Sequence, residues 1–181
     1  MKALLVSLGA SAAFLVASPA QSAVVSLGNS LARSCFEAAE ARIKNPASLD
    51  TCDRALADTL LPEDRVATLV NRGILHLLAN NHDQSRRDFD SALALDPSQP
   101  EAWLNKAILG VRQNNTAGAV PMVDRALALK TSKPALAYYV RGIAHEDAGN
   151  LPAAYADLLQ ARTLAPGWRD PVEQLQRFRV R

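Results

Sequence analysis

The chain contains 181 residues and carries a net charge of +2, with 49% hydrophobic residues but only 5% aromatic residues. This charge balance excludes a strong electrostatic field for attracting nucleic acid or an anionic membrane. Alanine and leucine make up most of the apolar residues, which favours close-packed helices over a β-sandwich of β-branched and aromatic side chains.

The N-terminus has the pattern of a secretory signal peptide. Lys2 is followed by an uncharged apolar run over 3–16 that is too short to span a bilayer, and Pro19 ends this run. Small residues then fit a cleavage site between residues 20 and 23. Residues 1–22 are therefore predicted to be a signal peptide, and the protein to be periplasmic or secreted. An uncleaved membrane anchor is the alternative, and no later stretch is long and apolar enough to predict a membrane helix.

A short tail over 23–30 precedes two helical runs that form the first hairpin of the chain, over 31–62. Asn45 and Pro46 end the first run, because the residue before a proline avoids the helical conformation. Ser48 is the expected N-cap of the second run. This hairpin matches the later units poorly, so we interpret it as a degenerate first unit.

A period of 34 residues organises the rest of the chain. In the second unit, over 63–99, a polar break separates helical runs at 63–79 and 83–95. The same pattern returns 34 residues later, over 100–134, and again 35 residues further on, over 135–168. The residues that return at equivalent positions are Gly73, Ala107 and Gly142; Ser85, Ala119 and Ala154; Phe89, Val123 and Leu158; and Ala92, Ala126 and Ala161. A fixed period in this range predicts a solenoid of stacked hairpins rather than one globular core.

Two features of the later units affect their helices. Pro121 falls within the second helix of the third unit, where a proline should delay the start of the helix or bend its first turn. Residues 169–181 follow the fourth unit and are expected to form a capping helix. Val172, Leu175 and Phe178 would give this helix an apolar stripe that covers the end of the stack.

Three units in register give the chain a resemblance to tetratricopeptide repeat proteins. The family pattern places large, small and tyrosine positions on the first helix, and alanine and aromatic positions on the second. In this chain the pattern appears as Leu69, Gly73, His76, Ser85 and Phe89 in the second unit, and as Tyr138, Gly142, His145, Ala154 and Leu158 in the fourth. The resemblance implies an all-α fold: a right-handed α-solenoid of about three such hairpins, a degenerate first hairpin and a C-terminal capping helix. It also implies a binding scaffold with a protein or peptide partner.

In this family the first helix of each unit lines a concave groove. The matching positions in this chain are Val70, Ile74, Leu77, Leu104, Ile108, Val111, Tyr139 and Ile143. They are mostly apolar, so the groove is expected to take an amphipathic or extended apolar segment. Asn71 and Asn105 stand beside these positions, but no basic residue completes the clamp that some family members use for a C-terminal carboxylate. The protein's own tail, its capping helix and a second copy of the chain are equal alternatives as occupants.

The chain has two cysteines, Cys35 and Cys52. On the resemblance, Cys35 takes the unit position of Arg72 and Cys52 that of Phe89, and these positions face each other across a family hairpin. An even number of cysteines in an exported chain favours a disulfide, which here would staple the unit with the poorest repeat match. Two buried free thiols are the alternative. A catalytic thiol pair is disfavoured because the spacing is not C-x-x-C.

No set of residues in the sequence has the spacing of an enzyme site. The three histidines, His76, His82 and His145, lack a metal-binding spacing, and neither a metal nor another cofactor is predicted. His76 and His145 share one unit position and are expected to pack between helices. The sequence therefore favours a protein without catalytic activity.

Arg72, Lys106 and Arg141 share another unit position and form a basic row along the stack. In one interpretation their stems pack against the helices and their charged ends pair with aspartates. The candidate aspartates are Asp88, Asp90, Asp124 and Asp157. In the other interpretation the row is an electropositive stripe for an acidic partner.

The sequence thus predicts a non-enzymatic scaffold or adaptor of the bacterial cell envelope that binds a peptide or helix in its apolar groove. The alternative is a structural subunit whose apolar face is permanently buried in an envelope assembly or a homo-oligomer. An enzyme with an unrecognised site is a third hypothesis, which no convergent set of polar residues favours. Neither a nucleic-acid partner nor a membrane span is predicted.

Overall fold

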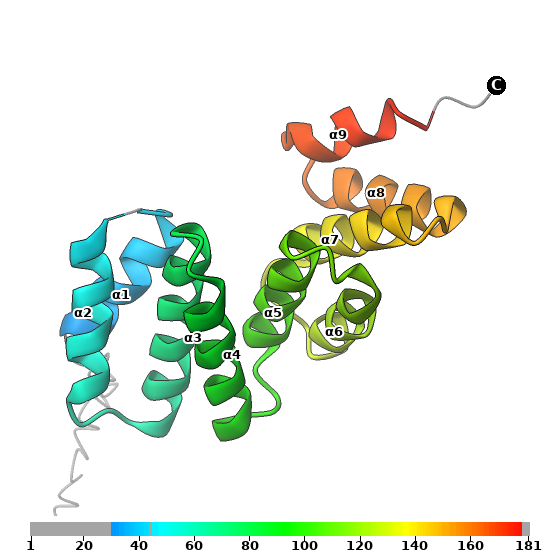
Figure 1. Ribbon diagram of the computed structural model, residues 1–181. Helices are drawn as coiled ribbons and strands as arrows, with labels where there is room; N and C mark the ends of the chain where they lie inside the picture. Colours follow the sequence, from blue (N-terminus) through cyan, green and yellow to red (C-terminus); the bar gives the residue numbers. More distant parts are fainter. Residues whose placement is uncertain (1–29, 44, 179–181) are drawn as a thin grey trace, which may run out of the picture.

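The computed structural model describes residues 30–43 and 45–178 of the chain. The predicted signal peptide over 1–22, most of the tail that follows it and the last three residues of the predicted capping helix lie outside the described residues. All regular structure in the described part is helical, and the helices pair into stacked antiparallel hairpins (Figure 1). The predicted all-α solenoid is therefore confirmed.

Nine helices lie within the described residues. They are α1 (Ser30–Glu40), α2 (Pro46–Ala57), α3 (Pro62–Leu78), α4 (His82–Leu95), α5 (Pro100–Arg112), α6 (Thr116–Ala128), α7 (Pro134–Asp147), α8 (Leu151–Leu164) and α9 (Arg169–Leu175). The hairpins α1/α2, α3/α4, α5/α6 and α7/α8 stack in chain order, and α9 packs against α8 (Figure 1). The stack has four units followed by a short terminal helix.

Prolines mark where four of the helices begin. Pro46, Pro62, Pro100 and Pro134 are the first residues of α2, α3, α5 and α7. A proline is favoured at this position because its fixed φ suits the helix and its missing N–H would have no partner within the helix. These prolines therefore set where the first helices of the second, third and fourth units start.

Residues in the left-handed conformation end the same three first helices. Asn80, Asn114 and Gly149 have φ angles of 62°, 58° and 76°. In each case the N–H of the following residue donates to the carbonyl five residues earlier, at 2.8–2.9 Å. This hydrogen-bond pattern satisfies a carbonyl that the end of the helix leaves free, and it turns the chain sharply. The second helix of each unit can then pack back against the first.

Small residues on the first helices let the second helices approach closely. A Cβ added at Gly73 would lie 2.5 Å from the Phe89 ring, and one added at Gly142 would lie 3.1 Å from the Leu158 side chain. Ser85 is fully buried in the same contact, where its hydroxyl donates to the Gly73 carbonyl at 2.9 Å. Close packing within the second and fourth hairpins thus depends on a small residue opposite a large one.

Two local expectations about the helices were wrong, and one of the two alternatives for Pro121 is excluded. The N-cap of α2 is Asn45, whose side chain accepts from a backbone N–H two residues on at 3.0 Å, and not Ser48. Pro121 does not delay α6, because five helical residues precede it and build the first turn. The terminal helix ends at Leu175, so Phe178 lies beyond it and belongs to a following turn.

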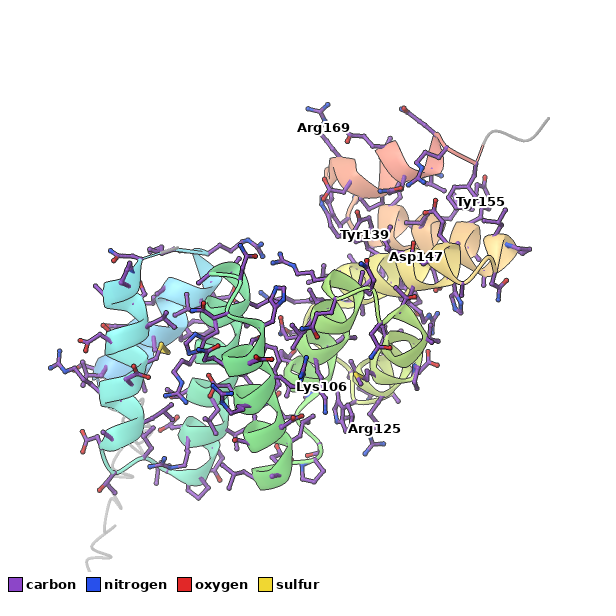
Figure 2. The ribbon with its side chains drawn as sticks, viewed as in Figure 1. Lys106, Arg125, Tyr139, Asp147, Tyr155 and Arg169 are labelled. Atoms are coloured by element: carbon purple, nitrogen blue, oxygen red, sulfur yellow. A yellow bond between two sulfur atoms is a disulfide. The ribbon has the colours of Figure 1, made fainter. Side chains whose placement is uncertain are left out.

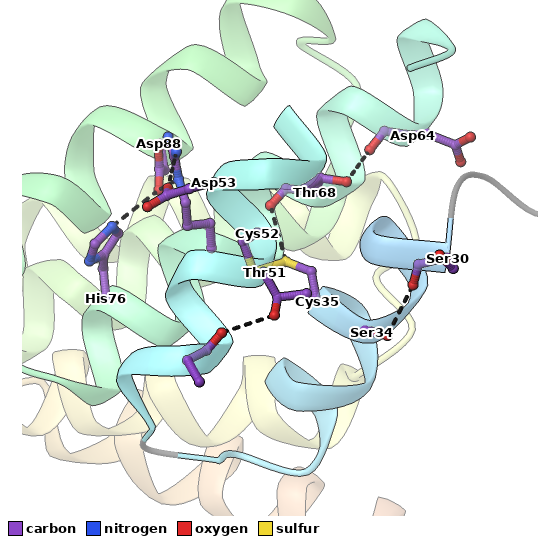
Figure 3. The surroundings of a disulfide bond; sticks show 12 residues. Ser30, Ser34, Cys35, Thr51, Cys52, Asp53, Asp64, Thr68, His76 and Asp88 are labelled. Atoms are coloured by element: carbon purple, nitrogen blue, oxygen red, sulfur yellow. Dashed lines mark hydrogen bonds and ion pairs between the residues drawn. A yellow bond between two sulfur atoms is a disulfide. The ribbon is translucent and has the colours of Figure 1, made fainter. Parts of the chain in front are cut away.

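A disulfide between Cys35 of α1 and Cys52 of α2 holds the first hairpin (Figure 3). The predicted pairing is present and both residues are fully buried, but the unit position expected for Cys35 was wrong by one residue. Cys52 corresponds to Phe89, and Phe89 faces Gly73. Cys35 therefore stands where Gly73 stands in the next unit, and not where Arg72 stands. A covalent bond replaces the close glycine–aromatic contact.

Candidate functional site: the concave groove

A concave groove runs along the inner side of the stack, lined by residues of α1, α3, α5 and α7 and by the terminal helix α9. It encloses about 1040 Å³. All eight residues expected from the sequence line it: Val70, Ile74, Leu77, Leu104, Ile108, Val111, Tyr139 and Ile143. The repeat brings them together because equivalent residues of successive first helices share one face of the stack.

These eight side chains lie at different depths. Val70, Leu77 and Leu104 are only 4%, 4% and 1% exposed, so they form the floor of the groove and belong to the core between helices. The half-buried members are Ile74, Ile108, Val111, Tyr139 and Ile143. The half-buried side chains provide the apolar surface that a ligand would cover.

Two asparagines add polar groups to this apolar surface. Asn71 is 8% exposed and its side-chain amide has no hydrogen-bond partner among the described residues. Asn105 occupies the equivalent position one unit later, where its Nδ2 donates to the Glu101 carbonyl at 2.8 Å. Both asparagines line the groove, so the free amide of Asn71 and the amide oxygen of Asn105 are suited to groups that a ligand would bring.

An ion pair joins the first hairpin to the loop before α7 at the edge of the groove. Lys133, which precedes α7, donates to the Glu40 carboxylate of α1 at 2.7 Å. Nearby, Glu101 accepts from the backbone N–H of Ser132 at 2.9 Å and from its hydroxyl at 2.8 Å. These contacts fix the loop between α6 and α7 against α5. The rim charges Glu40, Glu101 and Lys133 are therefore already paired or hydrogen-bonded.

Basic residues reach the groove from helix ends, where the sequence pattern did not predict them. Arg42 and Arg112 line it together with Lys133. Arg42 follows the end of α1, and Arg112 is the last residue of α5, where its Nη1 donates to the Leu77 carbonyl at 3.1 Å. Arg42 and Lys133 lie in loops, outside the groove-facing stripe of any helix, whereas Arg112 stands on this stripe one turn after Ile108. The groove positions expected for α5 ended at Val111 and only helix positions were followed, so all three were missed.

The terminal helix closes one end of the groove. The ring of Tyr139 lies 4.7 Å from that of Trp168, measured between centroids, which is within the range of a favourable aromatic pair. Burial raises the pKa of Tyr139 and outweighs the side chain of Gln174 of α9, which acts in the opposite direction. At the opposite end, Phe36 of α1 lines the groove and is 49% exposed. An aromatic side chain thus stands at each end.

The basic row is paired with aspartates, as the first of the two interpretations predicted. Arg141 binds both carboxylate oxygens of Asp157 at 2.7 Å and also reaches Asp124 of the preceding unit at 2.6 Å. Lys106 binds Asp90 of the preceding unit at 2.6 Å. Hydrogen bonding to Asp157, the largest contribution, raises the pKa of Arg141. The row therefore links neighbouring units and does not leave a stripe of unpaired charge.

The histidines of this region also serve packing. His76 Nε2 lies 3.9 Å from the Asp88 carboxylate, and its Nδ1 lies 3.4 Å from the Asn81 amide. Burial, the largest contribution, lowers the pKa of His76. His145 takes the equivalent place 3.9 Å from Asp157. The two histidines therefore fill space between helices beside the arginine–aspartate pairs.

The described residues contain no group of three or more histidine, cysteine or carboxylate side chains placed to hold a metal ion. Within the same residues, no helix has the length and apolar character needed to cross a bilayer. The chemistry that the groove offers is therefore apolar contact, amide hydrogen bonding and a charged rim.

Comparisons with known proteins agree with this architecture. The model of the tetratricopeptide repeat family matches residues 70–134 and 107–167. The crystal structure of PilW, a type IV pilus biogenesis factor, is similar with a TM-score of 0.71 and 20% identity, over 83% of this chain and 69% of PilW. Pseudomonas aeruginosa pilF gives a TM-score of 0.66 and 21% identity, over 81% of this chain and 65% of the pilF chain.

MamA from Desulfovibrio magneticus RS-1 gives a TM-score of 0.63 and 19% identity, over 81% of this chain and 82% of the MamA chain. At such identities the likeness shows the fold alone. No curated protein sequence matches the chain.

Proposed function

The chain belongs to the tetratricopeptide repeat family, and we propose that it is a non-enzymatic adaptor that holds an extended apolar segment of a partner protein in its concave groove. Repeat proteins of this type generally mediate protein–protein interaction. The observation that carries the proposal is the apolar groove with the unpartnered Asn71 amide on its surface. The Asn71 amide lies open to the groove without a hydrogen-bond partner among the described residues, so the backbone of a bound peptide would supply one.

The two asparagines favour an extended segment over a helix. A helix satisfies its own backbone N–H and C=O groups along its length, so it has little to offer a side-chain amide. An extended segment presents free backbone donors and acceptors on both sides. Asn71 and Asn105 stand one unit apart, so they would bond the backbone at two points. Side chains of the segment would then cover Ile74 and Ile108.

The cell envelope is the proposed location. The N-terminal pattern of a signal peptide supports it, and so does the buried disulfide, because such bonds persist in oxidising compartments. The similar solved structures include a type IV pilus biogenesis factor. This likeness is one of fold, so it neither places the protein in the cell nor names the partner.

The proposal is tested by photo-crosslinking in the native cell envelope. A photoreactive amino acid at Ile108, in the middle of the groove, should give a discrete adduct with another protein. Asn71→Ala and Asn105→Ala together should reduce this adduct without lowering the amount of folded protein. The matched control carries the same photoreactive amino acid at Arg87, an exposed residue of α4 that does not line the groove.

Either of two results would contradict the proposal. Adducts of equal yield from Ile108 and Arg87 would show that capture is unspecific. A crosslink from Ile108 only to the protein's own chain would show that the groove is already filled. The adaptor function would then have to be sought on another surface.

A further inference from the structure

The second helix of the last unit carries an apolar stripe where the inner units are mostly polar. Leu151, Tyr155 and Leu159 of α8 stand at the positions of His82, Arg86 and Asp90 in the second unit and of Thr116, Val120 and Asp124 in the third. Residues four apart lie on one face of a helix. The change therefore makes the face of α8 that carries Leu151, Tyr155 and Leu159 apolar.

In the inner units this face points toward the unit that follows. Asp90 binds Lys106 and Asp124 binds Arg141, each at 2.6 Å and each across a unit boundary. Leu159 replaces this aspartate in the last unit, where α9 takes the place of a following hairpin. The end of a repeat stack normally needs a polar outer face to stay soluble. We therefore expect another part of a protein to cover the apolar stripe at this end of the stack.

The terminal helix covers only part of the stripe. It has 7 residues, whereas the first helices α3, α5 and α7 have 17, 13 and 14. At a rise of about 1.5 Å per residue, α9 is roughly 10 Å long against roughly 21 Å for α8. Leu151 and Tyr155 remain 53% and 41% exposed. Tyr155 lies on α8 (Figure 2). It packs against Phe178, just past the end of α9, with ring centroids 6.0 Å apart.

We call Leu151, Tyr155 and Phe178 the end patch. Opposite charges flank it: Asp147 ends α7 beside the start of α8, and Arg162 continues the stripe three residues after Leu159. Both are exposed, and neither has an ion-pair partner among the described residues. Tyr155 lies near the midpoint between them along the chain.

We propose that the end patch is a two-fold interface between two copies of this chain, with α8 antiparallel to α8 of the second copy. A two-fold interface must be complementary to itself. In the antiparallel arrangement Asp147 of each copy approaches Arg162 of the other, and the two Tyr155 side chains meet at the axis. The apolar centre and the opposite charges at its two ends meet this requirement. The patch lies outside the groove, so the proposal is independent of the adaptor function.

Sedimentation velocity of the purified exported protein across the micromolar range tests the association. The mass should approach twice that of one chain as concentration rises. The Tyr155→Glu variant should keep the mass of one chain at every concentration. Asp147→Arg should weaken the dimer roughly tenfold, because two exposed ion pairs are lost per dimer. Asp147→Arg combined with Arg162→Asp should restore it. Leu164→Glu is the control, since Leu164 is 45% exposed on α8 but off the stripe.

Tyr155→Cys tests the geometry. A residue beside a two-fold axis pairs with its own copy, so this variant should form an intermolecular disulfide on mild oxidation, whereas Leu164→Cys should not. The native cysteines do not interfere because they are bonded to each other. A protein that stays monomeric at every concentration overturns the proposal, including one whose end patch binds a different protein. A dimer that persists in Tyr155→Glu, or fails to crosslink through position 155, also overturns it.

Discussion

The Arg72 guanidinium holds both oxygens of the Asp88 carboxylate, at 2.9 and 2.6 Å, across the two helices of the second unit. The same guanidinium reaches Asp53 of the preceding unit at 2.7 Å. One side chain therefore ties its own hairpin together and joins it to the unit before. The fourth unit repeats the arrangement with Arg141. Units of this stack are joined by polar contacts as well as by the apolar core.

Asp88→Asn should destabilise the fold by about 1–3 kcal/mol. The Asp88 side chain is only 6% exposed, and the substitution leaves the partly buried Arg72 without its main counter-charge. Urea denaturation followed by circular dichroism measures the change. Asp50→Asn is the matched control, because the Asp50–Arg54 pair is exposed and loosely formed at 3.9 Å. The control should change stability by less than about 0.5 kcal/mol.

Gly73→Ala should destabilise the second unit by about 1–3 kcal/mol, because the new methyl group would lie 2.5 Å from the Phe89 ring. The third unit pairs Ala107 with Val123 at the same positions. Adding Phe89→Val to Gly73→Ala reproduces this pair and should recover part of the loss. Gly118→Ala in α6 is the control.

An added Cβ at Gly118 would make only ordinary contacts, at 3.5 Å and beyond. The control should therefore stabilise the protein by about 0.5–1 kcal/mol through helix propensity. A Gly73→Ala protein that is equally stabilised would contradict the close-packing account. Thermal and urea denaturation distinguish the two outcomes.

Reducing the Cys35–Cys52 bond should lower stability by about 3 kcal/mol, as expected for a closed loop of this size, whose cysteines are 17 residues apart. The loss should concentrate in the first unit, so amide hydrogen exchange should rise most in α1 and α2. The unreduced protein should take up no alkylating reagent after denaturation. Two modified thiols under that condition would exclude the disulfide.

Stability should fall as pH drops below about 6.5, the usual pKa of a histidine in an unfolded chain. Burial lowers the pKa of His76 in the folded protein, so the unfolded chain takes up a proton first and is favoured. The contribution is fully present above the unfolded pKa and is lost between that value and the lower folded pKa. The contribution of His76 is isolated by comparing the urea midpoints of wild type and His76→Gln from neutral to mildly acidic pH. Equal pH profiles would contradict the prediction.

Most of the fold could be predicted because the sequence repeat determines where the helices lie and which faces pack. Gly73 and Gly142 fix where two helices approach, and a 34-residue period places every equivalent residue on the same face. The register of the first hairpin was harder to predict because one bond, the Cys35–Cys52 disulfide, sets it. Nothing near Cys35 in the sequence indicated that it stands at the glycine position and not one residue away.

The groove could be predicted only in part. Its apolar members follow the helical period, so Ile74 and Ile108 could be named from spacing alone. The rim could not, because Arg42 and Lys133 enter from loops whose direction depends on how the units turn relative to one another. The contact between Tyr139 and Trp168 likewise depends on where α9 packs.

The conformation of the bound segment tests the central claim most directly. Photoreactive residues at Ile74 and Ile108, in separate variants, would be followed by mass spectrometry of the partner residues they capture. Neighbouring helices lie roughly 10 Å apart. An extended segment rises about 3.3 Å per residue, so the account predicts captured positions about three residues apart. A spacing of about seven residues, at the helical rise of about 1.5 Å, would contradict it.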